Sequence, residues 1–356
     1  MKIRKKALAL AAIVSLTLVA HGVNAADLTF VSWGGTYGKS QAEALVKPYS
    51  AKTGHRILVE DYSGGLAQIR AQVKSNKVTW DVVDLELQDA IRACDEGLLA
   101  PIQARDLQGV PGVASVVDDF LPNSLTPCSV GTVMWANVIT FNLNKFVGSE
   151  PSTVGDFFDL KKFPGKRGMK KAAKANLEWA LMADGVAPAD VYKVLGTPAG
   201  LDRAFRKLNT IKSSIVWWEA GAQPPQLLAD GAVTMTSAYS GRIQAAIDVD
   251  RKPFKIIWQG QIPEYETLAI LKGSKNEATA RDFIKFASSP AVLAEQTKYI
   301  AYGPLRKSAL SLIESSVVSK LPSAAANIAV GVPSNPEWWA NNGDEINQRF
   351  SVWLAN

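Results

Sequence analysis

Histidine is almost absent from this chain of 356 residues, which contains only His21 and His55. An HExxH zinc site needs two histidines one helical turn apart, so the composition excludes it. The sequence also has no CxxC pair, no phosphate-binding GxxxxGK[ST] loop and no GxSxG nucleophile turn. We therefore expect neither a metal nor a cofactor, and we do not expect an enzyme.

A secreted hydrolase is the remote alternative, because His55 is the one histidine outside the N-terminal segment. This histidine follows Thr53 and Gly54, where a helix is expected to end and a strand to begin. No nucleophile motif accompanies it. We expect His55 to be a surface turn residue.

Long apolar runs are absent after residue 25, so no later segment is expected to span a membrane. The segment 1–25 combines a basic start, an apolar run of about fourteen residues and small residues at 23–25. This order is typical of a cleaved secretory signal peptide. We expect a periplasmic protein that begins near Ala26; an uncleaved anchor is the alternative.

The excess of positive charge is weaker than the total of +6 suggests. Four cations, Lys2, Arg4, Lys5 and Lys6, lie in the signal segment with no acid beside them. The rest of the chain is close to neutral, which removes the electrostatic argument for a nucleic-acid partner. About 330 residues exceed what one hydrophobic core usually supports, so we expect two domains.

Cysteine is scarce, and Cys94 and Cys128 are the only two. An oxidising compartment favours their pairing in a disulfide. The bond would close a loop of about 35 residues and stabilise the fold by roughly 3–4 kcal/mol. Two separate buried thiols are the alternative.

Predicted strands and helices alternate through the first hundred residues. The strands lie at 28–33, 56–61 and 81–85, and the helices at 37–52, 65–76 and 88–96. This alternation is typical of βαβ units and a parallel sheet. Pro48 is expected to kink or split the first helix.

Two long β-rich passages, 131–142 and 254–271, lie before and after a second group of predicted helices and strands. Its helices are predicted near 175–184, 199–212, 224–230 and 241–249, and its strands near 214–217 and 232–236. We interpret the two passages as crossings between lobes, which together form a hinge. Helices at 277–288 and 290–298 would complete the first lobe, and the tail, with Trp338, Trp339 and residues 347–354, would form a capping helix. The predicted fold is α/β, with two lobes that are each a sheet flanked by helices, and a ligand cleft at the hinge.

Aromatic and acidic side chains recur where these strands are expected to end, the edge at which open α/β sheets bind ligands. The candidate ligand-binding residues are Trp33, Tyr37, Asp84, Glu86, Trp218, Glu219, Tyr239, Glu266 and Tyr302. Aromatic faces hold ammonium groups at about 0.5–2 kcal/mol per contact. A carboxylate in a closed cleft pairs with the ammonium and rejects neutral ligands. We therefore predict a small organic cation as the ligand.

Several candidates also have a purely structural interpretation. Asp84 and Glu86 could cap the following helix, and Glu219 could be an exposed loop acid. Of the neighbours Trp217 and Trp218, we expect one to face the core and the other the cleft.

A basic run at 161–174 contains seven cations and no acid. We expect a solvated face, and a surface for an anion or a partner is the alternative. The run lacks the aromatic interleaving that is typical of nucleic-acid binding.

Five segments of the sequence resemble the extracellular solute-binding proteins of ABC transporters, and among these the spermidine/putrescine-binding type. They are Ser32–Gly35, Trp80–Asp84, Cys94–Leu99, Phe163–Gly168 and Trp217–Gln226. The resemblance covers most of the chain, from about Asp27 past Tyr302. It implies a type II periplasmic-binding-protein fold of two lobes that close on a solute, and delivery of that solute to a membrane permease.

By position, the resemblance implies roles in the cleft for five of the candidates. Trp33, Tyr37, Tyr239 and Tyr302 match aromatic contacts, and Glu266 matches an acid that pairs with an amine.

The sequence departs from the polyamine binders before the helix at 176–184, where acids are replaced by the lysine-rich segment 170–175. This departure argues against a long, doubly charged polyamine, and the ligand that we expect first is a small amine-bearing, polyamine-like solute. The alternative, for which these lysines and Arg242 are the reason, is an anionic or zwitterionic molecule such as an amino acid derivative or an aminophosphonate.

The predicted domains are the signal peptide at 1–25, lobe I at 26–137 with 267–303, and lobe II at 138–266 with 304–356. We expect a monomer that captures the solute without transforming it. Its partners would be the solute and the ABC permease, with no nucleic acid.

Overall fold

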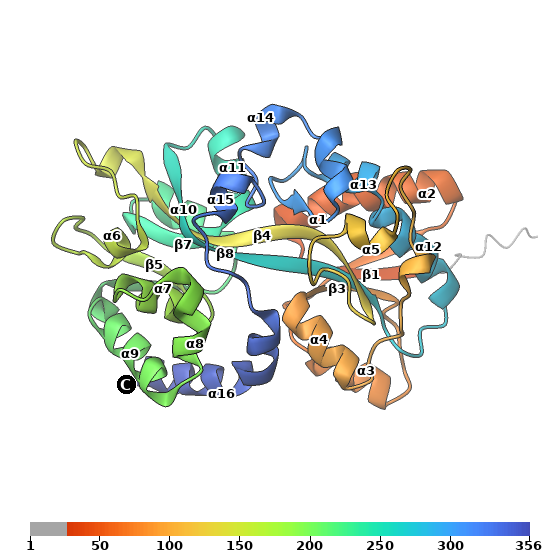
Figure 1. Ribbon diagram of the computed structural model, residues 1–356, viewed down its shortest axis with the longest axis horizontal. Coiled ribbons are helices and arrows are strands. Elements are labelled where there is room, and N and C mark those ends of the chain that lie inside the picture. The colour runs from red at the N-terminus through yellow and green to blue at the C-terminus, as the bar shows by residue number, and fades with distance from the viewer. Residues whose placement is uncertain (1–26) are drawn as a thin grey trace, which may run out of the picture.

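The computed structural model describes residues 27–356 (Figure 1), so the predicted signal peptide lies outside the described residues. The strands of this part of the chain are β1 Leu28–Ser32, β2 Ile57–Asp61, β3 Val82–Glu86, β4 Ser129–Asn142, β5 Arg167–Lys170, β6 Ile215–Trp218, β7 Met235–Tyr239, β8 Phe254–Ile270 and β9 Gly303–Pro304. They form one mixed sheet in the order β2-β1-β3-β8-β4-β7-β5-β6, with β9 paired to β4.

The first half of the molecule is built on the parallel strands β1, β2 and β3. Its helices are α1 Gly35–Gln41, α2 Lys47–Thr53, α3 Ala67–Lys74, α4 Leu87–Asp95, α5 Val116–Asp119, α12 Glu277–Ala287 and α13 Pro290–Gln296. The predicted alternation of strand and helix is confirmed here. A π-helical turn at Ala42–Val46 separates α1 from α2, and Pro48 lies in the first turn of α2. The chain is therefore helical without a break from Gly35 to Thr53, and the irregularity near Pro48 is this π-helical turn rather than a split.

Two long strands connect the halves. Strand β4 has 14 residues and β8 has 17, and the two pair antiparallel along most of their length. Strand β8 also pairs with β3 of the first half, whereas β4 pairs with β7 of the second. Both predicted β-rich passages are confirmed as strands, and Figure 1 shows them running from one half into the other.

The second half is built on the parallel pairs β5–β6 and β5–β7. Its helices are α6 Val154–Phe158, α7 Asn176–Ala183, α8 Val191–Leu195, α9 Pro198–Asn209, α10 Gln223–Ala229 and α11 Ser240–Asp248. Strand β5 lies inside the basic run for which a solvated face was expected. That expectation is wrong for Arg167, which is fully buried and donates to the Phe157 and Phe163 carbonyl oxygens. Backbone acceptors satisfy this guanidinium, so its burial is tolerated.

The C-terminal part of the chain contacts both halves. It contains α14 Ser315–Val318, α15 Ala325–Ile328 and α16 Pro336–Ala355. Helix α16 is longer than the predicted capping helix, because Asn335 caps it and Pro336 fits its first turn. It packs on the core of the second half through Trp339 and Phe350, and it also contacts α4, beside which it lies in Figure 1.

The segment that follows β9 binds the first half. Arg306 is fully buried and donates from Nε to Asp119 Oδ2 at 2.6 Å. The predicted boundary between lobes at residue 304 stays a prediction.

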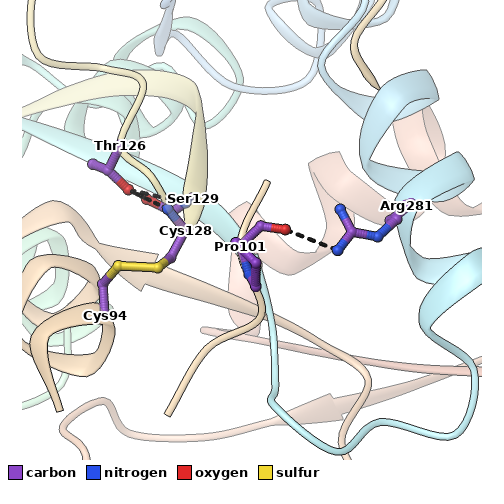
Figure 2. The surroundings of a disulfide bond; sticks show 6 residues. All are labelled: Cys94, Pro101, Thr126, Cys128, Ser129 and Arg281. Atoms are coloured by element: carbon purple, nitrogen blue, oxygen red, sulfur yellow. Dashed lines mark hydrogen bonds between the residues drawn. A yellow bond between two sulfur atoms is a disulfide. The ribbon is translucent and has the colours of Figure 1, made fainter. Parts of the chain in front are cut away.

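The predicted disulfide between Cys94 and Cys128 is confirmed. Figure 2 shows that it ties the end of α4 to the turn before β4, where the backbone N–H of Ser129 donates to the Thr126 hydroxyl. The bond thereby fixes a helix of the first half to the start of a connecting strand. Within residues 27–356, no helix has both the length and the apolar character that crossing a bilayer requires.

Candidate functional site

A cavity of about 350 Å³ lies between the two halves, on one face of β4 and β8. Its lining residues are Trp33, Gly35, Tyr37, Tyr62, Ser63, Glu86, Trp135, Lys170, Glu219, Ala220, Gly221, Ala222, Tyr239, Arg242, Glu266 and Tyr302. The volume falls in the range of about 300–1,000 Å³ that is usual for small-molecule sites. Most of these residues lie just beyond the ends of strands, where a ligand of an α/β sheet is expected.

Seven of the nine predicted ligand-binding residues line this cavity. They are Trp33, Tyr37, Glu86, Glu219, Tyr239, Glu266 and Tyr302. Their contacts with a ligand stay a prediction.

The other two predicted residues, Asp84 and Trp218, lie behind the cavity wall. Asp84 is fully buried, and its Oδ2 accepts hydrogen bonds from Gln41 Nε2 at 2.6 Å and Ser32 Oγ at 3.1 Å. Trp218 is buried under Tyr239, with ring centroids 5.5 Å apart. Both residues therefore support the wall and do not form its surface.

Four chemically active lining residues are missing from the predicted set. Tyr62 directly follows β2, and Arg242 lies in the first turn of α11, which directly follows β7. Inspection of the residues after the end of every strand would therefore have found both. Lys170 ends β5, a strand hidden within the basic run. Trp135 lies in the middle of β4, where no strand-end signal exists.

Glu266 is the acid at the centre of the site. Its Oε1 accepts from Trp135 Nε1 at 2.7 Å and its Oε2 accepts from Trp33 Nε1 at 3.0 Å. Burial, followed by the charges of Asp84 and Glu86, raises the pKa of Glu266 well above its usual range. Two indoles thus fix the carboxyl group in position among aromatic faces.

Aromatic rings surround this acid on several sides. Trp33 packs on Tyr62 with centroids 5.0 Å apart, and Trp135 packs edge-on against Tyr239 at 4.8 Å. Such faces attract a cation through the ring quadrupole. A ligand ammonium placed beside Glu266 would therefore meet both a carboxylate and π-faces.

The second half contributes positive charge to the same cavity. The Lys170 ammonium lies 5.2 Å from the centroid of the Tyr239 ring. Burial alone would lower the pKa of Lys170, but the neighbouring Tyr239 and Glu86 raise it above its usual value, so this lysine stays charged.

Arg242 brings the second cation, and its Nε is buried without a partner. A Cβ at Gly35 would come within 2.7 Å of Arg242 Nη1, and Gly35 has a φ of +60°. Glycine at that position therefore leaves the guanidinium its space. A guanidinium with an unused donor is suited to bind a carboxylate.

The remaining lysines of the cluster are held by acids. Lys174 is buried and pairs with Glu264 Oε2 at 2.5 Å, whereas Lys171 pairs with Glu219 Oε1 at 3.1 Å on the surface. The Glu219 side chain is 74% exposed, so the exposed-loop interpretation fits it better than a buried charge contact.

The residues that the structure describes do not support metal binding or catalysis by His55. Residues 27–356 hold no group of three side chains that could bind a metal ion. His55 lies outside the cavity, 3.6 Å from Asp27 and stacked on Tyr49. The arrangement of residues is suited to binding a small charged molecule.

The sequence and the fold both have known relatives. Residues 44–326 match the family described as bacterial extracellular solute-binding proteins. A gamma-aminobutyric acid-binding protein of Pseudomonas aeruginosa is 41% identical over 329 residues, which are 92% of this chain and 91% of that protein.

Two solved structures extend the comparison to the fold. An ABC transporter substrate-binding protein from Bradyrhizobium japonicum matches with a TM-score of 0.84 and 34% identity, over 93% of this chain and 100% of that one. A GABA receptor matches with a TM-score of 0.81 and 33% identity, over 93% of this chain and 98% of that one.

These matches confirm the predicted α/β fold of a periplasmic binding protein and the predicted resemblance. They also confirm that the protein binds a solute and is not an enzyme. The match to the family model covers most of the chain, and the relatives match it nearly end to end. The chain therefore belongs to the bacterial extracellular solute-binding protein family and is the solute-binding component of an ABC transporter.

Proposed function

We propose that this protein captures a small zwitterion with an ammonium group at one end and a carboxylate at the other, such as γ-aminobutyrate. The observation that carries the proposal is that both signs of charge line one cavity. Glu266 and Glu86 come from the connecting strand β8 and from β3, whereas Lys170 and Arg242 come from the second half. In this proposal the ligand ammonium binds at Glu266 and the ligand carboxylate binds at Lys170 and Arg242.

A polyamine fits this cavity less well than a zwitterion does. The second ammonium of a diamine would approach Lys170 or Arg242, and two like charges at about 4 Å repel by several kcal/mol in a partly dry site. The predicted alternative, an amino acid derivative, is therefore favoured over the polyamine-like solute. The relative named for gamma-aminobutyric acid and the solved GABA receptor support the same choice.

We also propose that the protein acts in the periplasm as a monomer, after removal of residues 1–25. The two halves would close over the solute by bending at β4 and β8, and the closed form would dock on the permease. The cavity is lined from both halves, so closure would remove the ligand from water and strengthen its ion pairs.

Titration calorimetry with three ligands of similar length tests the proposal. We expect γ-aminobutyrate to bind, and putrescine and butyrate to bind at least about 30-fold more weakly, because each leaves a buried charge unpaired. Glu266→Gln should weaken γ-aminobutyrate binding by a similar factor. Glu219→Gln is the matched control, since this acid lies exposed at the rim. Tighter binding of putrescine than of γ-aminobutyrate would overturn the proposal.

A further inference from the structure

We propose that Asp84 and Glu266 share one proton in the unliganded protein and that the ammonium group of the ligand displaces this proton on binding. Capture of the solute is then linked to proton release, and the affinity rises with pH. The inference rests on the proposed function, because it needs an ammonium beside Glu266.

The strand register brings the carboxyl groups of the pair to one face. Strands β3 and β8 are antiparallel, and Glu86 lies directly opposite Glu266 while Asp84 lies opposite Leu268. Side chains alternate along a strand, so Asp84, Glu86 and Glu266 project from the same face. Diagonal neighbours across such a pair have Cβ atoms about 7–8 Å apart or less, within reach of two carboxyl side chains.

Both groups of the pair are removed from water. Asp84 is 0% exposed and Glu266 is 4% exposed. Neither forms a salt bridge within residues 27–356. Two like charges in such a site cannot both be ionised at modest cost, so a shared proton is the favourable state.

Unused hydrogen-bonding atoms mark the place of this proton. Asp84 Oδ1 and the Tyr37 hydroxyl are both buried and take no part in the other hydrogen bonds of the site. Interaction with this hydroxyl lowers the pKa of Asp84, against the larger effect of burial. The other oxygen of Asp84 is taken by Ser32 and Gln41, and both oxygens of Glu266 accept from indoles. Asp84 Oδ1 is thus the oxygen of the two carboxyl groups that accepts none of these hydrogen bonds, so the shared proton is assigned to it.

The groups facing the pair come from every element around it. They are Tyr37 on α1, Tyr62 after β2, Glu86 on β3, Lys170 on β5, Tyr239 on β7, Arg242 on α11 and Tyr302 before β9. The positive charges of Lys170 and Arg242 act to lower the pKa values of the two carboxyl groups. The Lys170 ammonium, however, lies over the Tyr239 ring. Arg242 interacts with Tyr302 and lowers the pKa of that phenol, against the larger effect of burial.

The balance of these effects leaves the pair protonated near neutral pH. Burial raises the pKa of Asp84 to about 6, against its interactions with Gln41, Tyr37 and Ser32. Burial and the neighbouring Asp84 raise the pKa of Glu266 well above its usual range. Because the two titrations interact, the retained proton belongs to the pair and not to one residue.

An ammonium group reverses this balance. An opposite charge within about 4–6 Å lowers the pKa of a carboxyl group by about 1–3. The O–H bond of the carboxylic acid breaks, its proton passes to the buffer, and the ammonium pairs with the carboxylate that remains. One positive charge replaces another, so a neutral solute cannot drive the exchange and is rejected.

Calorimetric titration of the full mature protein with γ-aminobutyrate in buffers of different ionisation enthalpy tests the inference. At pH 7 we expect about 0.5–1 proton released per ligand bound. Between pH 6 and 8 the affinity should rise by up to about tenfold per pH unit. Binding whose heat is the same in every buffer would overturn the inference and leave the proposed function intact. Absence of binding would overturn both.

Asp84→Asn separates the pair without changing the cavity surface, because Asp84 does not line it. Glu266 then has one negative neighbour fewer, so we expect the proton release to fall by at least about half and the affinity at pH 6 to exceed that of the wild type. The control is Asp89→Asn, which removes a half-buried acid outside the cavity whose pKa burial also raises to about 6. This control should leave the proton release unchanged.

Infrared difference spectroscopy of the wild-type protein gives a second readout that does not depend on any variant folding. Addition of γ-aminobutyrate should remove the C=O stretch of a protonated carboxylic acid and produce carboxylate bands. A spectrum in which ligand binding leaves the carboxylic acid band in place would overturn the inference.

Discussion

Replacing Lys174 by methionine tests how a buried ion pair supports the wall behind the cavity. The Lys174 ammonium donates to Glu264 Oε2 at 2.5 Å and also to Gln88 Oε1 of helix α4. The Glu264 side chain is 3% exposed, and its Oε1 has no partner. Removal of the ammonium leaves a buried carboxylate uncompensated, which costs about 3–5 kcal/mol if the charge remains.

The expected loss of stability depends on pH. Burial raises the pKa of Glu264 from 4.5 to about 7 even beside Lys174. A raised folded-state pKa means that stability falls as the pH rises from the unfolded value to the folded one. In the variant the pKa of Glu264 rises further, so stability keeps falling to higher pH, by about 1.4 kcal/mol for each further pH unit. We expect a loss of about 1 kcal/mol at pH 5.5, where Glu264 is protonated in both proteins, and about 3 kcal/mol at pH 8.5.

Urea unfolding followed by tryptophan fluorescence at these two pH values measures the difference. The matched control is the double variant Lys174→Met with Glu264→Gln, which removes both charges and should recover more than half of the loss at pH 8.5. An equal loss at both pH values would refute the reasoning, and so would a double variant whose loss is the sum of the two single losses.

Three further predictions concern the covalent link and the cavity. Replacing Cys94 and Cys128 by serine should lower the free energy of unfolding by roughly 3–4 kcal/mol, and thermal or urea unfolding would show an unchanged midpoint if the bond contributes nothing. Gly35→Ala should weaken γ-aminobutyrate binding at least about tenfold, because the new Cβ displaces Arg242; calorimetry with undiminished affinity would contradict this role. Glu219→Gln should change the affinity by less than about fivefold, because exposed ion pairs contribute about 1 kcal/mol or less, and a larger loss would move this acid into the binding contacts.

The alternating part of the fold follows from local sequence patterns, whereas the short strands β5 and β9 do not. Strand β1 is an apolar run, and β4 and β8 are rich in β-branched and aromatic residues, so their positions were predictable. Strand β5 has only four residues and includes Arg167 and Lys170. The burial of Arg167 depends on the preceding segment folding back so that its carbonyl oxygens accept from the guanidinium, and Lys170 lines the cavity. The hydrophobic pattern of the sequence reveals neither arrangement.

The tail was predicted as a capping helix that includes Trp338, Trp339 and residues 347–354, but the residue at which it begins was not. Asn335 followed by Pro336 is a helix start signal, and the helix runs from there to Ala355. The tryptophans at 338 and 339 lie within the helix, and Trp339 packs in the core of the second half.

The site residues that lie at the end of a strand, or directly after it, were predictable from the sequence. Trp33, Glu86 and Tyr239 obey that rule. Trp135 does not, because β4 continues past the cavity and presents this indole from its middle. The positive charge of Lys170 was likewise hidden, because a cation in a lysine-rich run is more often solvated than buried.

The central claim is that one cavity holds both ends of a small zwitterion, and a crystal structure of the protein with γ-aminobutyrate tests it most directly. The account predicts the ligand nitrogen within about 3 Å of a Glu266 carboxylate oxygen, and the ligand carboxylate on Arg242 or Lys170 at a similar distance. A ligand bound in the opposite orientation, or outside this cavity, would contradict the account.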